Sequence, residues 1–165
     1  MGALLSVVAC ITAPPPDLPQ LPDQPPSIEG DAVFPPQGPL TQWPEGGTFT
    51  VPVHMSKPGE GFFYAVVYDY GTASQFVAWP PTQASALPDG GNELITVPGL
   101  KPPSDKRVCP HQIEFVVAAR FEPGTTTPNA VGGDVVNWTY VPSGTPTGCP
   151  PYDAGTGAFP DGGDQ

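Results

Sequence analysis

Hydrophobic and polar residues alternate with a period of two along two stretches of this chain. Residues 48–55 are TFTVPVHM, and residues 111–122 are HQIEFVVAARFE. That period is typical of a β-strand that buries one of its two faces. Pro52 in the first stretch indicates a sheet edge or a bulge, because proline cannot donate a ladder hydrogen bond. The faces that we expect to be buried carry Phe49, Val51, Val53 and Met55 in the first strand and Ile113, Phe115, Val117, Ala119 and Phe121 in the second.

The opposite faces of these two strands are polar, and we expect them to face water. His54 lies on that face of the first strand. The second strand carries Gln112, Glu114, Arg120 and Glu122 there. A sheet with one apolar face has to pack that face against another layer.

A third stretch, FFYAVVYDYG at residues 62–71, is apolar on both faces and rich in aromatic and β-branched residues. This composition is typical of a central strand. Shorter strands are expected at 75–79, ending before two prolines, at 94–97 and at 134–141. Glycine- and proline-rich turns separate the strands, and no stretch has helical periodicity. The sequence predicts an all-β fold, a single antiparallel sandwich of about seven strands within residues 28–150.

The two ends of the chain differ from this central region. Residues 10–27 are rich in proline after Cys10, and proline favours an extended backbone, so we expect a semi-rigid tether there. Residues 151–165 are rich in glycine and aspartate and predict a disordered acidic tail. For residues 30–47 we expect either a first edge strand or a loop lying on the core, anchored by Val33, Phe34, Leu40 and Trp43.

Several stretches resemble the fibronectin type III family. ITVPGLKP at 95–102 is similar to the E strand and following corner of that family, and IEFVVAA at 113–119 is similar to its F strand. YAVVY at 64–68 is similar to its C strand. The resemblance covers roughly residues 48–141 and implies an immunoglobulin-like or fibronectin-III-like sandwich.

Two residues depart from the pattern of that family. Ile113 stands where the family has a tyrosine whose hydroxyl holds the corner, so another group must hold it here. The tryptophan usual on the B strand is missing, and Val53 or His54 lies near its place.

Composition and charge narrow the class of partner. The 27 prolines and 20 glycines among 165 residues approach the level of low-complexity sequence, but the apolar residues are concentrated in the short strands. The net charge is −11, with only five lysines and arginines. This balance argues against duplex nucleic acid, which needs clustered basic residues. It also requires that any membrane attachment use an anchor instead of a basic patch.

The chain has three cysteines, Cys10, Cys109 and Cys149, so one of them has a different role if the others are paired. An antiparallel pairing with Arg120 opposite Val136 would bring Cys109 and Cys149 close to register across one hairpin. We therefore predict a disulfide between them, and with it an oxidising compartment. The alternative is that both are free thiols in loops.

The same pairing raises a question of parity. It places Trp138 and Tyr140 on the polar face that carries Arg120 and Glu122. Either a bulge shifts the parity, or part of the N-terminal segment covers that face.

The sequence around Cys10, VVAC after an apolar run, resembles the lipobox of bacterial lipoprotein signal peptides. That resemblance implies that Cys10 is lipidated, that residues 1–9 are the remnant of a signal peptide, and that the proline-rich run is the tether. Ile11 is not the aspartate that retains many lipoproteins at the inner membrane. The resemblance therefore implies an outer-membrane lipoprotein or a cell-surface protein of the bacterial envelope.

Two other interpretations of this opening stay open. The first six residues, MGALLS, match an N-myristoylation signal, and Cys10 would then be a palmitoylation site in a eukaryotic cytosol. A disulfide between Cys109 and Cys149 would not persist in that compartment. Alternatively, the opening is merely a frayed tail.

Residue types that carry catalysis are scarce in this chain. His54 and His111 are the only histidines, and no nucleophile elbow is present. We therefore expect no enzymatic activity, no metal and no cofactor. Tyr70 and Trp79, near strand ends, are a candidate binding patch. The expected function is a lipid-anchored, non-catalytic binding or structural module, or alternatively an accessory subunit that binds carbohydrate or protein in an envelope complex.

Overall fold

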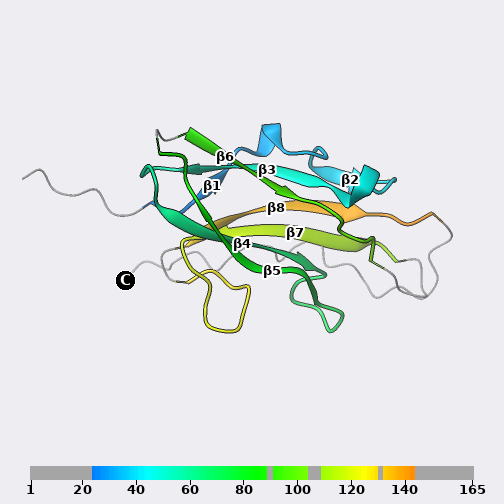
Figure 1. The fold of residues 1–165 in the computed structure, drawn as a ribbon. Coiled ribbons are helices and arrows are strands. Elements are labelled where there is room, and N and C mark those ends of the chain that lie inside the picture. The colour runs from blue at the N-terminus through cyan, green and yellow to red at the C-terminus, as the bar shows by residue number, and fades with distance from the viewer. Residues whose placement is uncertain (1–23, 89–90, 104–108, 130–131, 144–165) are drawn as a thin grey trace, which may run out of the picture.

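Two β-sheets pack face to face in the computed structural model (Figure 1), which describes residues 24–88, 91–103, 109–129 and 132–143. In these residues the chain is mostly strand. Its only helical elements there are two 3₁₀ turns, η1 (Gly30–Ala32) and η2 (Glu45–Gly47). The predicted all-β sandwich is confirmed at this level.

The smaller sheet has three antiparallel strands in the order β1 (Ser27–Ile28), β3 (Phe49–Met55) and β6 (Gly91–Val97). The strand predicted from alternation at 48–55 is confirmed as β3. On its core face the burial follows the predicted pattern, with Phe49, Val51, Val53 and Met55 buried. On the opposite face His54 is exposed as expected, but Pro52 is buried.

The larger sheet has five strands in the order β2 (Gly38–Leu40), β8 (Gly133–Tyr140), β7 (His111–Ala118), β4 (Gly61–Tyr68) and β5 (Phe76–Ser85). All neighbours are antiparallel except β2 and β8, which run parallel. The expectation of a purely antiparallel sandwich is therefore wrong at this edge. The central position predicted for β4 is confirmed, since β5 and β7 flank it.

Pro52 lies in the middle strand of the smaller sheet, so its predicted position at an edge or bulge is wrong. The backbone oxygen of Pro52 accepts a hydrogen bond from the amide of Glu29, just beyond β1. In a strand, the nitrogen and oxygen of one residue face the same neighbour, so the nitrogen of Pro52 also faces this side. The next contact on that side is the bridge between Phe34 and Thr50. The amide hydrogen that Pro52 lacks would therefore point into the gap between the β1–β3 pairing and the Phe34–Thr50 bridge, where no ladder hydrogen bond is lost.

β5 runs through Pro80 and Pro81, although the sequence predicted that this strand would end before them. β5 is an edge strand, so its prolines can point their nitrogens away from β4 without losing a ladder bond. The pairing with β4 shifts register on both sides of Val66. At these shifts Pro80 and Pro81 have no directly paired residue on β4, so the two prolines fit into the strand.

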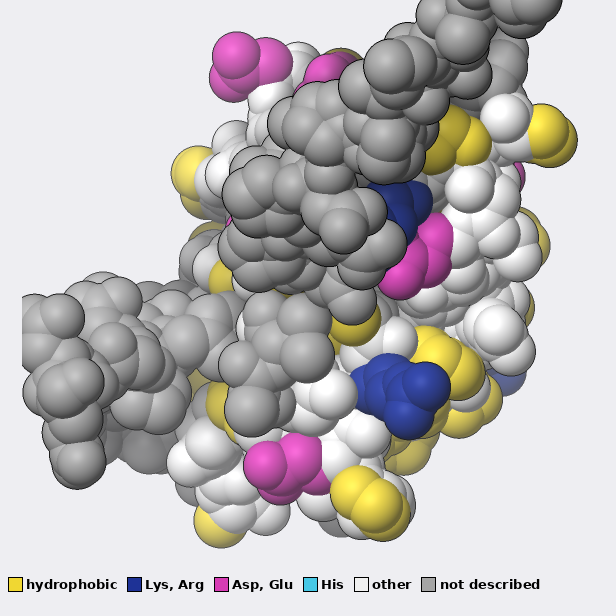
Figure 2. Space-filling model, turned by 90° about the vertical axis from the view of Figure 1, so that its left-hand side faces the viewer, with side chains coloured by type: hydrophobic (Ala, Val, Ile, Leu, Met, Phe, Trp, Pro, Cys, Tyr) yellow, Lys and Arg dark blue, Asp and Glu magenta, His cyan; other side chains and the backbone are white. Residues whose placement is uncertain are grey.

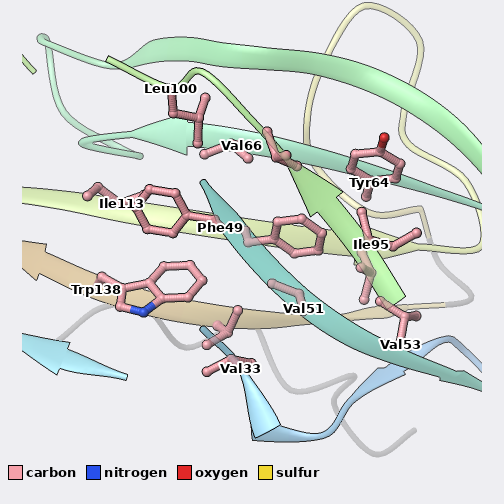
Figure 3. Close-up of a cluster of buried hydrophobic side chains, with 14 of the residues drawn as sticks. Val33, Phe49, Val51, Val53, Tyr64, Val66, Ile95, Leu100, Ile113 and Trp138 are labelled. Atoms are coloured by element: carbon pink, nitrogen blue, oxygen red, sulfur yellow. The ribbon is translucent and has the colours of Figure 1, made fainter. Parts of the chain in front are cut away.

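The core lies between the sheets and is rich in aromatic side chains (Figure 3). Phe49 of β3 meets Trp138 of β8 edge-on, with ring centroids 5.0 Å apart. Tyr64 of β4 stacks on Phe115 of β7 at 5.6 Å. From the N-terminal segment, Val33 also joins this cluster. Edge-on and stacked pairs contribute beyond the area that they bury, so they help to fix one packing of the sheets.

The predicted pairing of the last two strands is wrong. Val136 lies opposite Phe115 and not opposite Arg120, and Trp138 lies opposite Ile113. The physical reason is that β7 ends at Ala118, although hydrophobic residues continue to alternate through Phe121. In the observed register Trp138 faces the core, and the β7–β8 ladder has no bulge.

The segment after β6 is held by two side-chain hydrogen bonds. The hydroxyl of Tyr68 donates to the backbone oxygen of Lys101 at 2.8 Å, and the indole nitrogen of Trp43 donates to that of Leu100, also at 2.8 Å. Gly47 fits against this segment with φ of 62°, and a Cβ there would come within 1.9 Å of the Leu100 oxygen. We call residues 99–103 with these contacts the corner. The hydroxyl of Tyr68 therefore holds the corner, in place of the tyrosine hydroxyl that is absent at Ile113.

Candidate functional site

The two residues of the candidate binding patch do not share a surface. Trp79 pairs with Val66, whose side chain belongs to the core, and Trp79 itself packs against that core. Tyr70 lies beyond the end of β4, is 38% exposed, and lines the outer side of the larger sheet. The irregular pairing of β5 explains the error, because it changes which residues of that strand face the core.

Tyr70 instead belongs to a groove of about 1360 Å³ on the outer face of β4 and β5. Phe63 and Gln83 lie directly opposite each other on the floor, and Val77 continues the floor toward Tyr70. These residues alternate along their strands with residues that face the core, so the floor is the sheet surface turned away from the sandwich interior.

One wall of the groove is the loop of residues 119–129, between β7 and β8. In Figure 1 this loop, drawn in yellow, and the loop after β4, drawn in green, project from the same side of the larger sheet. A hydrogen bond of 3.2 Å between the hydroxyls of Tyr70 and Thr127 joins the two loops. The loop keeps its own shape, because the amide of Glu122 donates to Thr127 and that of Asn129 donates to Arg120.

The groove combines aromatic rings with planar polar side chains. Phe63, Tyr70 and Phe121 supply the rings, and Gln75 and Gln83 supply amides. The side-chain oxygen of Gln75 accepts the amide of Gly71 at 3.0 Å, which leaves its NH₂ group as a donor. The lining thus offers flat apolar faces and hydrogen-bonding groups in one trough.

Charge in the groove is sparse and mixed. Arg120, the only arginine among the described residues, lines it together with Glu60 and Glu122. Within that same part of the chain Arg120 is exposed and forms no ion pair. Figure 2, which views the sandwich from the side at the left of Figure 1, shows described charged side chains of both signs scattered among hydrophobic and polar ones. The described surface in this view therefore has no basic patch.

A second cluster joins the end of β4 to the start of β7, next to Tyr70. Asp69 has φ of 52° and places its carboxylate against His111, with Nδ1 of the ring 2.7 Å from Oδ2. Its other oxygen accepts the amide of Gln112 at 2.9 Å, and its own amide donates to the Gln112 oxygen at 2.8 Å. A carboxylate can only accept, so Nδ1 carries the hydrogen.

This Asp–His pair has the geometry of a base held by its orienting carboxylate. However, Nε2 of His111 is buried and has no hydrogen-bond partner among the described residues, so no hydroxyl or thiol there stands ready as a nucleophile. The described part of the chain also has no cluster of three metal-ligating side chains. The contacts that the pair does make fasten the turn after β4 to the start of β7.

The sequence analysis assigned His111 to neither face of the predicted strand and therefore missed this pair. One signal was available, because His111 has the same parity as Ile113 and so falls on the buried face of its strand. Asp69 had no comparable signal, since its role depends on a backbone conformation that is uncommon outside glycine.

Glu114 is buried, although alternation predicted that it would face water. It lies on the outer face of β7, between Val67 of β4 and Asn137 of β8, and is 8% exposed. Burial raises the pKa of its carboxyl above the ordinary value, because the charged form loses solvation. The side-chain oxygen of Asn137 is also buried and lacks a partner among the described residues. This outer surface is therefore not the solvated polar face that the sequence predicted.

Of the three cysteines, only Cys109 lies within the described residues, where it is buried two positions before β7. The observed register would put Pro142 opposite Cys109, so strand pairing no longer supports the predicted disulfide with Cys149. That pairing stays a prediction, because Cys149 lies outside the described residues. Cys10 and the segments 1–9 and 151–165 lie outside them too, as does most of the tether at 10–27.

Comparisons with protein-family models, with curated proteins and with solved structures found no match for this chain. Among the residues that the structure describes, none forms a helix long and apolar enough to cross a membrane.

Proposed function

We propose that this chain is a lipid-anchored, non-catalytic binding or structural module of the bacterial cell envelope, an outer-membrane lipoprotein or a cell-surface protein. The observation that carries the binding role is the open groove, which gathers aromatic and polar side chains from β4, β5 and the 119–129 loop. Exposed side chains of mixed character that converge in one concave surface are typical of binding sites.

We further propose that the sandwich is of the immunoglobulin-like or fibronectin-III-like type. The strand order supports this, because β3 and β6 pair in one sheet while β8, β7, β4 and β5 follow one another in the second. That arrangement corresponds to strands B and E facing strands G, F, C and C′. The corner held by Tyr68 and not by a tyrosine of β7 is a departure from the family pattern.

The proposed anchor is Cys10, within its lipobox-like sequence VVAC. β1 begins at Ser27, so residues 11–26 separate the anchor from the sandwich. In a polyproline-type conformation these residues would span about 50 Å, which is enough to hold the groove away from a membrane surface. The same proposal includes the Cys109–Cys149 disulfide, since the envelope is an oxidising compartment.

Metabolic labelling with a fatty acid tests the anchor directly. We expect the label on the wild-type chain and not on Cys10→Ser, and membrane fractionation should show the variant released. Unchanged labelling of Cys10→Ser would refute lipidation at this residue. Mass spectrometry under non-reducing conditions tests the disulfide, and two free thiols besides Cys10 would refute it.

An accessory subunit of an envelope complex is the second candidate, and the joined loops that bear Tyr70 and Thr127 favour it. A pull-down from envelope extracts separates the candidates. A stable protein complex that is lost in Tyr70→Ala supports the accessory subunit. Retention of envelope polymer without protein supports the stand-alone module.

A further inference from the structure

We infer that the groove on the outer face of β4 and β5 binds an extended, uncharged saccharide chain. This inference rests on the proposed binding role and specifies the class of its ligand. A sugar ring has an apolar face that can lie on an aromatic ring, and hydroxyl groups that need hydrogen-bond donors and acceptors at its rim. The groove offers both kinds of group.

The shape of the groove favours a chain over a small ligand. Its volume of about 1360 Å³ exceeds the usual range for small-molecule pockets, roughly 300–1,000 Å³. Its lining runs from Gly61, at the start of β4, to Tyr70, just beyond its end. At about 3.3 Å per residue that path is on the order of 30 Å long. A linear polymer of several units fits such a trough.

The aromatic side chains lie at different places along this path. Phe63 is on the floor near the start of β4, and Phe121 is on the loop wall. Tyr70 closes the far end, where its hydroxyl is held by Thr127 and its ring position is thereby restricted. Rings that are fixed before the ligand arrives lose little conformational entropy on binding.

The polar side chains along the same path have free hydrogen-bonding capacity. Gln83 stands opposite Phe63 on the floor and makes no side-chain hydrogen bond with the described residues. Gln75 has its NH₂ group free beside Tyr70. Amide side chains offer donors and acceptors together, which suits hydroxyls, since each hydroxyl both donates and accepts.

Charge favours an uncharged polymer over an acidic one. The chain carries a net charge of −11, and its field repels anionic ligands. The groove is lined by one arginine, Arg120, and by two carboxylates, Glu60 and Glu122, so no net positive charge of the lining offsets that repulsion. Arg120 then serves as a multiple donor to hydroxyl oxygens.

The geometry favours a saccharide over an extended peptide. A peptide strand typically joins a sheet at an open edge, through backbone hydrogen bonds. The floor of the groove is a sheet face, and the backbone groups of β4 are already used by β5 and β7. Over β4, the groups that remain for a ligand are side chains.

Isothermal titration of the full chain carrying Cys10→Ser tests the inference, with cellohexaose, chitohexaose and maltohexaose as probes. We expect at least one of the three to bind. Tyr70→Ala and Gln83→Ala should each weaken its affinity about tenfold or more, as is usual for central contact residues. Phe76→Ala is the matched control, because Phe76 is an exposed aromatic residue of the same edge strand that lies outside the groove. Circular dichroism checks that each variant is folded.

The inference is overturned if none of the three probes binds, or if Tyr70→Ala and Gln83→Ala keep wild-type affinity. An uncharged ten-residue peptide, titrated in parallel, gives the competing result. If the peptide binds, both substitutions abolish that binding and no saccharide binds, the inference of a saccharide ligand is wrong. The proposed binding function of the groove would still hold. If neither probe class binds and envelope material is retained equally by wild type and Tyr70→Ala, the proposed function of the groove fails as well.

Discussion

The corner and the groove contain similar aromatic and polar side chains, but these side chains bond within the protein in the corner and are open to solvent in the groove. In the corner, the hydroxyl of Tyr68 and the indole N–H of Trp43 both donate hydrogen bonds to backbone oxygens of the segment after β6. In the groove, Tyr70 is partly exposed, and Gln83 and Arg120 keep their hydrogen-bonding groups uncommitted to described residues. A tyrosine whose hydrogen bond is buried contributes to stability, whereas one on an open surface is available to a ligand. Substitutions in the two regions should therefore have different costs in free energy of unfolding.

The largest loss of stability is expected from Gly47→Ala in the corner. A methyl group there meets the Leu100 backbone oxygen, and the backbone keeps a positive φ that alanine disfavours. We expect a loss of about 3 kcal/mol or more in urea unfolding followed by circular dichroism. Gly124→Ala, in the groove loop, is the control, because it has φ of 75° with open space around its Cβ. It should cost about 1 kcal/mol, and an equal cost for both would contradict the close contact in the corner.

Tyr68→Phe should have the next largest effect. It removes the donor to Lys101 while preserving the ring, and we expect a loss of about 1 to 1.5 kcal/mol. Tyr64→Phe is the matched control on the same strand, because the Tyr64 hydroxyl has no hydrogen bond with the described residues. Urea unfolding of both variants would separate the hydrogen bond from the ring. A neutral Tyr68→Phe would show that Trp43 alone holds the corner.

Glu114→Gln should stabilise the fold by a few degrees in Tm at pH 7. Burial raises the pKa of Glu114 in the folded state, so the folded state favours the protonated carboxyl. The stability that the protonated carboxyl contributes is therefore lost as the pH rises through the folded-state pKa. Glutamine stays neutral at every pH. The difference in Tm between Glu114→Gln and the wild type should therefore disappear below about pH 4, where the glutamate is protonated in both the folded and the unfolded state. Thermal melts from pH 4 to pH 8 measure this difference. Glu122→Gln, exposed in the groove loop, should leave Tm unchanged, and a constant offset for Glu114→Gln would contradict the titration.

Gln83→Ala should have the smallest effect on stability, within about 0.5 kcal/mol. Its side chain is exposed on the groove floor and makes no hydrogen bond with the described residues. Urea unfolding of this variant completes the comparison, since the same substitution is expected to weaken ligand binding. A loss as large as that of Tyr68→Phe would mean that the groove floor is part of the structural framework.

The sequence predicted inner faces better than outer ones. In Phe49–Met55 and Ile113–Val117, hydrophobic residues that face the core recur at every second position, and that pattern is visible without a structure. The end of β7 was not visible, because Ala119 and Phe121 continue the same alternation inside a loop. Glu114 was misjudged because alternation reports only the polarity of a residue and not what lies over it.

The groove could be predicted only in part. Tyr70 was predicted to belong to a binding patch, which stays a prediction, but its hydrogen-bond partner Thr127 lies 57 positions away, and only the fold brings them together. Trp79 was assigned to the same patch because strict alternation cannot register the shifts around Val66. The corner shows the same limit, since a missing tyrosine at residue 113 predicted that a substitute exists but not that it is Tyr68.

The parallel pairing of β2 with β8 has a consequence for the order of folding. Among the described strands β8 is the last in the chain, and it lies between the early strand β2 and the late strand β7. Asp134 of β8 also accepts the amide of Ile28, at the end of β1. A chain that emerges from its N-terminus therefore exposes one side of β2 and one side of β7 until residues 133–140 arrive. If the chain is secreted as proposed, we expect the sandwich to be completed only after residues 133–140 have been translocated.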